Sequence, residues 1–212
     1  VTSKKHLLNP GHFIKKHNLT MWFSVPSLGL NMLKMKQLKK NAFPSLRQTL
    51  FCGEALPQSL VESWQNAAPN SKIDNLYGPT ETTIAILSYR WIKKISKKEC
   101  INGIVPIGIP FKKQMANYIT DSSGKLKSQS FGELCLSGSQ IFKGYLNSSK
   151  NSASKFFKSK NKRVWYKTGD LIKKNSHGNY IYLGRVDRQI KVRGFRVETQ
   201  EVESLLRKII KN

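Results

Sequence analysis

Short apolar runs alternate with helix-like stretches between residues 9 and 91 of the chain. The runs have the length of strands and end at Gly, Pro or polar residues, whereas the stretches between them carry apolar residues at helical spacing. Strands are expected at Leu19 to Ser24, Thr49 to Cys52 and Lys72 to Leu76, and helices at Asn9 to His17, Ser27 to Met35 and Pro57 to Ala67. This alternation predicts a mostly parallel α/β sheet.

The pattern changes after Gly103, where Gly, Pro and Ser separate short runs of β type. Met115 to Thr120, Gly132 to Ser137 and Asn179 to Leu183 are examples of these runs. Their spacing is typical of a small antiparallel sheet or barrel.

The pattern changes again in the last part of the chain. Gln189 to Val197 is a compact basic ribbon, and a helix with one apolar face is expected from Thr199 onward. We therefore predict three parts: an α/β subdomain at 1–100, a small β-barrel subdomain at 101–186, and a short region at 187–212 that begins another α+β domain.

The formal net charge of +25 over 212 residues raises the question of nucleic-acid binding. Most of the positive charge comes from lysines, many of them in scattered pairs, and no RNA- or DNA-binding motif accompanies them. A solvated basic surface is therefore favoured over a specific nucleic-acid partner. A protein that binds nucleic acid or an anionic membrane stays an alternative.

The sequence offers few indications of its cellular compartment or of membrane insertion. The longest apolar stretch, Met21 to Leu33, is interrupted by polar residues and Pro, so no membrane span is expected. The first residues lack the apolar segment of a signal peptide. Because the three cysteines form no CxxC pair, the sequence favours a reduced, cytoplasmic protein.

The segment from Asn75 to Thr83 carries the densest set of chemical groups in the sequence. It reads Asn-Leu-Tyr-Gly-Pro-Thr-Glu-Thr-Thr and combines an aromatic ring, a Gly-Pro turn, hydroxyls and one carboxylate. These groups suit a nucleotide and its metal ion. Read alone, the segment is also compatible with an ordinary turn.

Four further segments accompany this loop. They are Leu50 to Pro57 (LFCGEALP), Gly132 to Gly138 with Lys143 to Asn147 (GELCLSG and KGYLN), Tyr166 to Leu171 (YKTGDL), and Gly184 to Glu198 (GRVDRQIKVRGFRVE). In this order and spacing, the segments resemble the adenylate-forming superfamily. The resemblance is strongest to amino-acid adenylation domains of nonribosomal peptide synthetases, and it extends from about Leu19 to Glu203.

The resemblance implies a two-step reaction. A substrate carboxylate attacks the α-phosphate of ATP to give an acyl-adenylate and pyrophosphate. A thiol, usually the phosphopantetheine arm of a carrier protein, then takes the acyl group. The implied ligands are ATP or AMP and Mg²⁺, and the implied partners are a small carboxylate, an amino acid, and a phosphopantetheinylated carrier protein or domain.

The resemblance also assigns roles within the Asn75 to Thr83 segment. The Tyr77 ring would lie against adenine, Asn75 would bond the base edge, and Gly78 would form the turn. Thr80 would contact the α-phosphate, and Glu81 would bind Mg²⁺, which prefers oxygen ligands.

Other segments would complete the nucleotide site and link it to the rest of the enzyme. Gly53 and Glu54 would line the adenine site, Asp170 would accept both ribose hydroxyls, and Arg185 would reach the sugar or a phosphate. Asp187 would be the hinge about which the small C-terminal domain rotates.

The substrate pocket is expected to be apolar. By the resemblance, its wall would consist of Phe23, Leu50, Cys52, Leu76 and Ile84. Such a wall favours a small or apolar side chain over a charged one.

Several residues in these segments also have plain structural interpretations. Asp170 would serve equally well as the cap of a turn in Thr-Gly-Asp, and Glu133 is expected to brace the entry to a strand. Tyr145 and Trp165 are expected in the core of the barrel.

Two parts of the superfamily's machinery are not found among the 212 residues. A Ser/Thr/Gly-rich phosphate loop should precede Leu19, and residues 1–18 contain nothing like it. The catalytic lysine of the small domain has no counterpart, because neither Lys191 nor Lys211 lies in a matching motif. We therefore expect an incomplete part of an enzyme, inactive on its own. An acyl-CoA synthetase or D-alanyl carrier-protein ligase fragment and a non-catalytic nucleotide-binding relative stay open.

Overall fold

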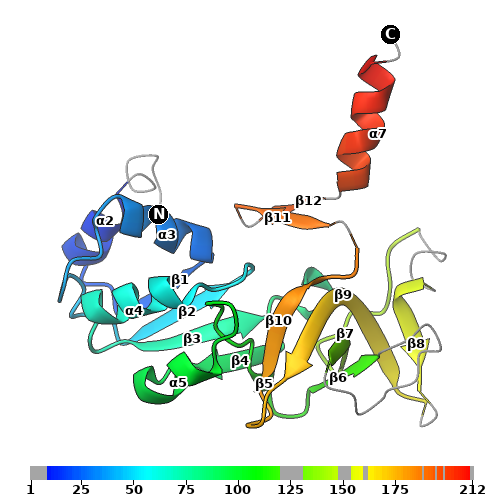
Figure 1. Cartoon of the computed structure of the whole chain (residues 1–212), viewed down its shortest axis with the longest axis horizontal. Helices are drawn as coiled ribbons and strands as arrows, with labels where there is room; N and C mark the ends of the chain where they lie inside the picture. The colour runs from blue at the N-terminus through cyan, green and yellow to red at the C-terminus, as the bar shows by residue number, and fades with distance from the viewer. Residues whose placement is uncertain are drawn as a thin grey trace.

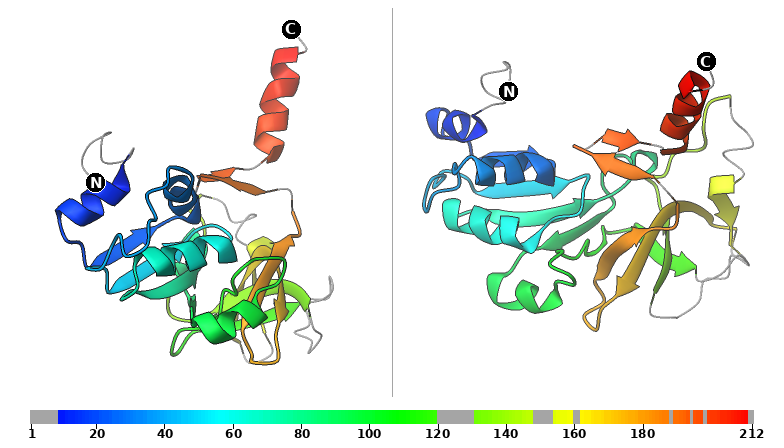
Figure 2. Two further views of the ribbon diagram at one scale, coloured as in Figure 1. Left: turned by 60° about the vertical axis from the view of Figure 1, so that its left-hand side comes forward. Right: turned by 45° about the horizontal axis from the view of Figure 1, so that its top comes forward.

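A computed structural model shows two sheets side by side, with a hairpin and a helix beyond them (Figure 1). It describes residues 9–119, 131–147, 154–159, 162–187, 189–193, 195–197 and 199–210. Figure 2 shows the two sheets next to each other from two further sides. Among the described residues, no helix has the length and apolar character needed to cross a membrane.

The first sheet is mixed, with the strand order β1-β2-β3-β4-β5. Its strands are β1 (Met21–Ser24), β2 (Gln48–Cys52), β3 (Lys72–Tyr77), β4 (Leu87–Arg90) and β5 (Ile109–Pro110). β1, β2 and β3 pair in parallel, as the alternating pattern predicts. β4 pairs antiparallel with β3, because the chain returns directly from β3 through the loop 78–86 instead of crossing over the sheet. β5 pairs antiparallel with β4.

The helices of this part are α2 (Pro10–Lys16), α3 (Pro26–Lys34), α4 (Gln58–Ala67), α5 (Lys93–Glu99) and the 3₁₀ turn η1 (Thr80–Thr82). At the start of α2, the Asn9 side chain accepts a hydrogen bond from the His12 amide, and Pro10 occupies the first turn. This is the predicted start of that helix. The sequence analysis did not predict α5.

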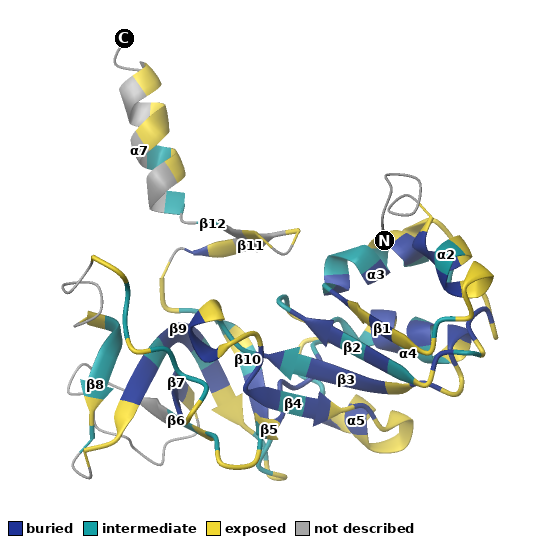
Figure 3. Cartoon of the chain, turned by 180° about the vertical axis from the view of Figure 1, so that it is seen from behind, coloured by how far each residue is buried: buried dark blue, intermediate teal, exposed yellow. Residues whose placement is uncertain are grey.

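One face of the first sheet packs against α3 and α4. Trp64 of α4 is fully buried and donates a hydrogen bond from Nε1 to Thr49 Oγ1 at 2.9 Å. Its ring contacts Phe51 edge to face at a centroid distance of 5.2 Å. Gly29 lets α3 approach closely, since a Cβ there would lie 3.0 Å from the Leu60 side chain of α4. Figure 3 shows the resulting buried strands.

The second sheet is antiparallel, with the order β10-β9-β7-β6 and β8 paired to β9. Its strands are β6 (Met115–Ile119), β7 (Phe131–Ser137), β8 (Phe156–Lys158), β9 (Val164–Lys174) and β10 (Tyr180–Arg185). The antiparallel sheet is as predicted. Among the described residues, the pairings do not join its edge strands into a barrel. Thr120, expected at the end of β6, lies outside the described residues.

A shared apolar core joins the two sheets. Its buried residues come from the β3–β4 region and from β7, β9 and β10, and they include Tyr77, Ile86, Leu134, Ile172 and Tyr180. The end of β3 is therefore packed against β9. This contact positions the candidate site.

The last part of the chain forms a hairpin and a helix. β11 (Ile190–Val192) and β12 (Phe195–Val197) pair antiparallel, and α7 (Thr199–Ile210) follows. Both match the ribbon and the helix expected from the sequence. The three-part domain division stays a prediction.

Candidate active site

A cavity of about 610 Å³ opens where the parallel strands β2 and β3 end. Ligand sites in α/β sheets commonly lie beyond the carboxyl ends of parallel strands. The predicted site residues that line the cavity are Gly53, Glu54, Leu76, Tyr77, Gly78, Arg185 and Asp187. Val105, Ile107 and Tyr182 supply much of the remaining wall. The cavity thus brings together residues from three of the five sequence segments.

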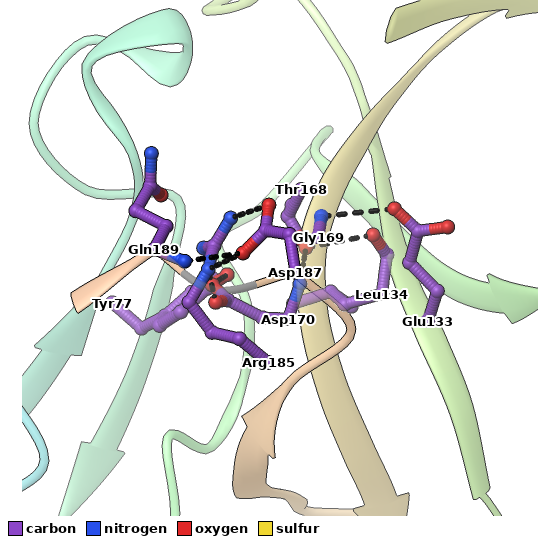
Figure 4. Close-up of polar contacts among 9 residues, drawn as sticks. All are labelled: Tyr77, Glu133, Leu134, Thr168, Gly169, Asp170, Arg185, Asp187 and Gln189. Carbon is purple, nitrogen blue, oxygen red and sulfur yellow. Dashed lines mark hydrogen bonds and ion pairs between the residues drawn. The ribbon is translucent and has the colours of Figure 1, made fainter. Parts of the chain in front are cut away.

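Asp170 lies behind this cavity in a network of polar contacts (Figure 4). Its side chain is 6% exposed; Tyr77 donates its hydroxyl to Oδ2, and Arg185 Nη1 lies 2.6 Å from Oδ1. Arg185 also donates through Nε and Nη2 to the two oxygens of Asp187, each at 2.6 Å. One guanidinium therefore joins β9 to the segment that follows β10.

Burial and neighbouring charges shift the pKa values of three residues in this network. Burial and the adjacent Asp170 carboxylate hold the pKa of Tyr77 well above its usual value, so Tyr77 stays a donor. Burial lowers the pKa of Arg185, but Asp187 and Asp170 outweigh it and leave that pKa above its usual value. Partial burial raises the pKa of Asp187, and Arg185 outweighs it and holds that pKa below its usual range.

A local bend in β9 presents Asp170 to the network. Gly169 has φ +76°, a left-handed conformation that favours glycine, and its amide donates to Glu133 Oε1 at 2.9 Å. A Cβ on Gly169 would lie 2.5 Å from Arg185 Nη2. The Asp170 amide donates to the Thr168 hydroxyl at 3.0 Å. The segment is thus a bent strand instead of the expected turn, and Glu133 is the structural brace predicted from the sequence.

The loop after β3 holds Thr80 and Glu81. Gly78 packs closely there, since a Cβ would lie 2.7 Å from the Ala85 Cα. Thr80 is exposed, whereas Glu81 is only 5% exposed. Thr83 and Ile84 follow with φ of +55° and +72°, a conformation that costs a β-branched residue about 1–3 kcal/mol. The surrounding structure must therefore hold the loop in place.

Tyr145 contacts Glu81, one of the predicted site residues. It was expected in the barrel core, but it is half-buried and donates a hydrogen bond from its hydroxyl to Glu81 Oε1 at 2.6 Å. The two residues are 64 positions apart, so only the folded chain brings them together. The Gly-Tyr pair in the segment Lys143 to Asn147 was the one available signal.

Two predicted nucleotide contacts are engaged in structural hydrogen bonds. Asn75 is 3% exposed, and its amide donates to the carbonyls of Val105 and Pro106 at 3.3 and 2.9 Å. It does not line the cavity. Glu54 does line it, but its Oε2 accepts from the Ser27 amide at 2.8 Å in the first turn of α3. The base contact expected of Asn75 would therefore have to come from its amide oxygen.

The predicted substrate-pocket residues share one face of the first sheet. In the strand register, Phe23 pairs with Leu50 and Cys52 pairs with Leu76, so their side chains point to the face opposite α4. Phe23 is 53% exposed on this face. The Cys52 thiol donates to the Ile84 carbonyl at 3.8 Å, which places the fifth residue beside them. Only Leu76 of this set also lines the cavity.

The sequence profile of the AMP-binding enzyme family matches residues 1–146. The chain belongs to this family. Among curated relatives, malpinin synthetase of Mortierella alpina is 35% identical over 199 residues, covering 92% of this chain and 2% of that protein. The D-alanine–D-alanyl carrier protein ligase of Lacticaseibacillus rhamnosus is 32% identical over 198 residues, covering 92% of this chain and 38% of that enzyme.

Two solved structures share this fold. The Vibrio cholerae adenylation domain AlmE, solved with glycyl-adenosine-5'-phosphate, matches with a TM-score of 0.88 and 39% identity, over 98% of this chain and 39% of that chain. IdnL7 matches with a TM-score of 0.81 and 33% identity, over 98% of this chain and 40% of that chain. The predicted fold class, part of an adenylation-domain fold, is therefore confirmed. The chain spans about two fifths or less of the relatives that it matches.

Proposed function

We propose that this chain is part of an enzyme that uses ATP to convert a small amino acid into an acyl-adenylate. The acyl group would then pass to the phosphopantetheine thiol of a carrier protein. The observation that carries the proposal is the cavity beyond β2 and β3, bordered by Tyr77, Gly78 and Arg185, with Asp170 paired to Arg185 behind it. Its position in a chain similar to AlmE, which was solved with an aminoacyl-adenylate, supports the same use.

The geometry fits the nucleoside part of an adenylate. Tyr77 borders the cavity with its hydroxyl directed to Asp170, so its ring is held in one orientation. Asp170 accepts one hydrogen bond on each oxygen from Tyr77 and Arg185. A carboxylate has about four acceptor positions, so ribose hydroxyls can add to these two bonds without replacing them.

The phosphate side would involve Thr80 and Glu81. Thr80 exposes its hydroxyl, and Glu81 supplies a carboxylate that Tyr145 orients. Mg²⁺ takes one or two protein carboxylates together with substrate phosphates and water, so a single Glu fits its donor set. Mg²⁺ would neutralise charge on the phosphates as pyrophosphate leaves. The chain's part is to hold Glu81 in a fixed, water-poor position.

The substrate class is argued from the exposed face of the first sheet. Phe23, Leu50, Cys52 and Leu76 present apolar or thiol groups there. Such groups pair poorly with a charged side chain. The relatives named above include a D-alanine ligase and an adenylation domain solved with a glycyl adenylate. Together these support glycine or alanine as the carboxylate.

Asp187 is proposed to be the hinge between the two reaction steps. It lies after β10, where Arg185 ties it to Asp170 and its Oδ1 accepts from the Gln189 amide at 3.2 Å. A residue at the end of an element, held by a few polar contacts, suits the start of a rigid-body rotation.

An amino-acid-dependent exchange of pyrophosphate into ATP tests the proposal. The intact protein, as its gene encodes it, is assayed with glycine, L-alanine, D-alanine, lysine, glutamate and a fatty acid. We expect exchange with glycine or an alanine and little with the charged amino acids. Exchange with the fatty acid alone would identify an acyl-CoA synthetase instead. ATP binding without exchange for any acid would identify a non-catalytic relative.

A matched pair of variants tests the assignment of Glu81. Glu81→Ala should lower exchange by about 100-fold or more, because it removes the proposed metal ligand. Glu62→Ala serves as the control, because Glu62 lies on α4 in an exposed pair with Lys97. Equal activities of the two variants would refute the role of Glu81.

A further inference from the structure

The loop that carries Thr80 and Glu81 is held by a segment of the antiparallel sheet region. We propose that Gln140 and Tyr145 are positioning residues that fix Glu81 in its working position. This inference rests on the proposed function for its catalytic meaning, but the structural coupling can be measured without any activity. Neither residue is expected to touch the substrate.

Gln140 joins the loop at three points. Its side-chain amide donates to the Ala85 carbonyl at 2.8 Å and to the Thr82 carbonyl at 3.5 Å. Its backbone carbonyl accepts from the Thr83 hydroxyl at 3.1 Å. Gln140 therefore spans the two residues whose positive φ values strain the loop. Such a conformation persists only where neighbouring contacts impose it.

Phe142 and Tyr145 extend the same contact to Glu81. The Phe142 amide donates to the Glu81 carbonyl at 3.0 Å, and the Tyr145 hydroxyl donates to Glu81 Oε1 at 2.6 Å. The Tyr145 ring is itself fixed by an edge contact with Phe142, with centroids 4.9 Å apart. Phe142 packs in turn on Phe156 at 5.4 Å. Both the backbone and the carboxylate of Glu81 are thus tied to the second sheet region.

Loss of these contacts should weaken the binding of Mg²⁺ more than the binding of substrate. A carboxylate that must coordinate Mg²⁺ binds it better when a neighbouring hydrogen bond orients it in advance, and removing such a bond costs on the order of 10- to 100-fold. Tyr145→Phe keeps the ring and its packing and removes only the hydroxyl. We expect it to raise the Mg²⁺ concentration for half-maximal exchange by about tenfold, with the KM for the amino acid unchanged.

A double variant separates action through Glu81 from a general structural effect. In the Glu81→Ala background, Tyr145→Phe should cause no further loss of exchange, because its target is already absent. Additive losses would overturn the proposal. So would an unchanged Mg²⁺ dependence of the single variant.

Amide hydrogen exchange provides the readout that is independent of activity. In the wild-type chain, the Thr82, Thr83 and Ala85 amides donate hydrogen bonds within the loop, at 3.0, 3.1 and 2.9 Å. Gln140→Ala and Tyr145→Phe should speed exchange of these amides at least several-fold and leave those of α4 unchanged.

Two control variants remove comparable bonds elsewhere. Gln65→Ala deletes an amide that bridges the Ala68 and Ser71 carbonyls at 3.2 Å each. Tyr180→Phe deletes a hydroxyl bonded to the Ala116 carbonyl at 2.8 Å. Neither should change exchange in the Thr82–Ala85 loop. Loop exchange that stays at the wild-type rate in Gln140→Ala and Tyr145→Phe would overturn the inference, whereas an inactive wild-type protein would overturn only the proposed function.

Discussion

Removing one partner of the buried Arg185–Asp170 pair should lower the unfolding free energy strongly. Arg185→Met replaces the guanidinium by an apolar side chain of similar length and leaves the Asp170 carboxylate without its cation. The two side chains are only 9% and 6% exposed, so little water reaches the pair in the wild-type fold. Breaking a buried pair in this way costs about 3–5 kcal/mol of unfolding free energy. We expect a loss of that size.

The double variant Arg185→Met/Asp170→Asn should be more stable than Arg185→Met alone. The amide removes the unpaired charge while its oxygen still accepts from Tyr77. The remaining cost is then that of lost neutral hydrogen bonds, about 1–3 kcal/mol. The Asp187 carboxylate costs little stability when Arg185 is absent, because its side chain is 36% exposed and can be hydrated.

Urea unfolding at pH 7, followed by circular dichroism, measures both values from the shift in midpoint. Lys97→Met is the matched control, because it breaks the Lys97–Glu62 pair of 2.9 Å, whose side chains are 46% and 31% exposed. It should cost less than about 1 kcal/mol. The reasoning would be refuted if the double variant lost as much unfolding free energy as Arg185→Met and Asp170→Asn lose together.

Three further predictions follow from single sites. Burial raises the pKa of the Cys100 thiol to about 11 and that of Cys135 further, so iodoacetamide at pH 8 should label both slowly in the native chain and rapidly in urea, as mass spectrometry would show. Because Arg185 holds the pKa of Asp187 below its usual range, the stability that Asp187 contributes is present above about pH 4 and lost as the pH falls through its lower folded value. The difference in urea midpoint between wild type and Asp187→Asn should therefore shrink from pH 5 to pH 3, and a constant difference would contradict this. Gly78→Ala should lower stability by about 1–3 kcal/mol in thermal unfolding, because the new Cβ would lie 2.7 Å from a backbone atom, and an unchanged midpoint would show that the loop has room to move.

The elements that the sequence predicted well are those whose signals are local. β1, β2, β3, α3 and α4 follow from runs of apolar residues and from apolar residues at helical spacing, and Pro57 marks the start of α4. The helix α5 was missed because it consists largely of lysine pairs. In the structure, its buried side holds Glu99, which accepts a hydrogen bond from the Tyr89 hydroxyl, and Ser96, whose hydroxyl is hydrogen-bonded to the same Tyr89 oxygen at 2.8 Å. A helix stabilised by polar contacts gives no apolar stripe to detect.

In the candidate site, too, only the local signals could be detected in the sequence. The motif that contains Asn75, Tyr77 and Glu81 could be located from the sequence, but the partners of these residues could not. Asn75 donates to carbonyls some 30 residues away, and Tyr77 donates to Asp170 across 93 residues. Such contacts depend on how two sheets pack. No local pattern encodes them.

The packing between the two sheets is therefore part of the candidate site. The buried cluster that includes Tyr77, Ile86, Leu134 and Ile172 holds the end of β3 against β7 and β9. On one side of this cluster, the bend at Gly169 presents Asp170 to Tyr77. Next to this cluster, the segment around Gln140 supports the strained loop that carries Glu81. A carboxylate from the second sheet and a carboxylate from the first are thus placed by one interface. For the proposed nucleotide chemistry, residues of that interface with no contact to a ligand are then as necessary as the residues that border the cavity.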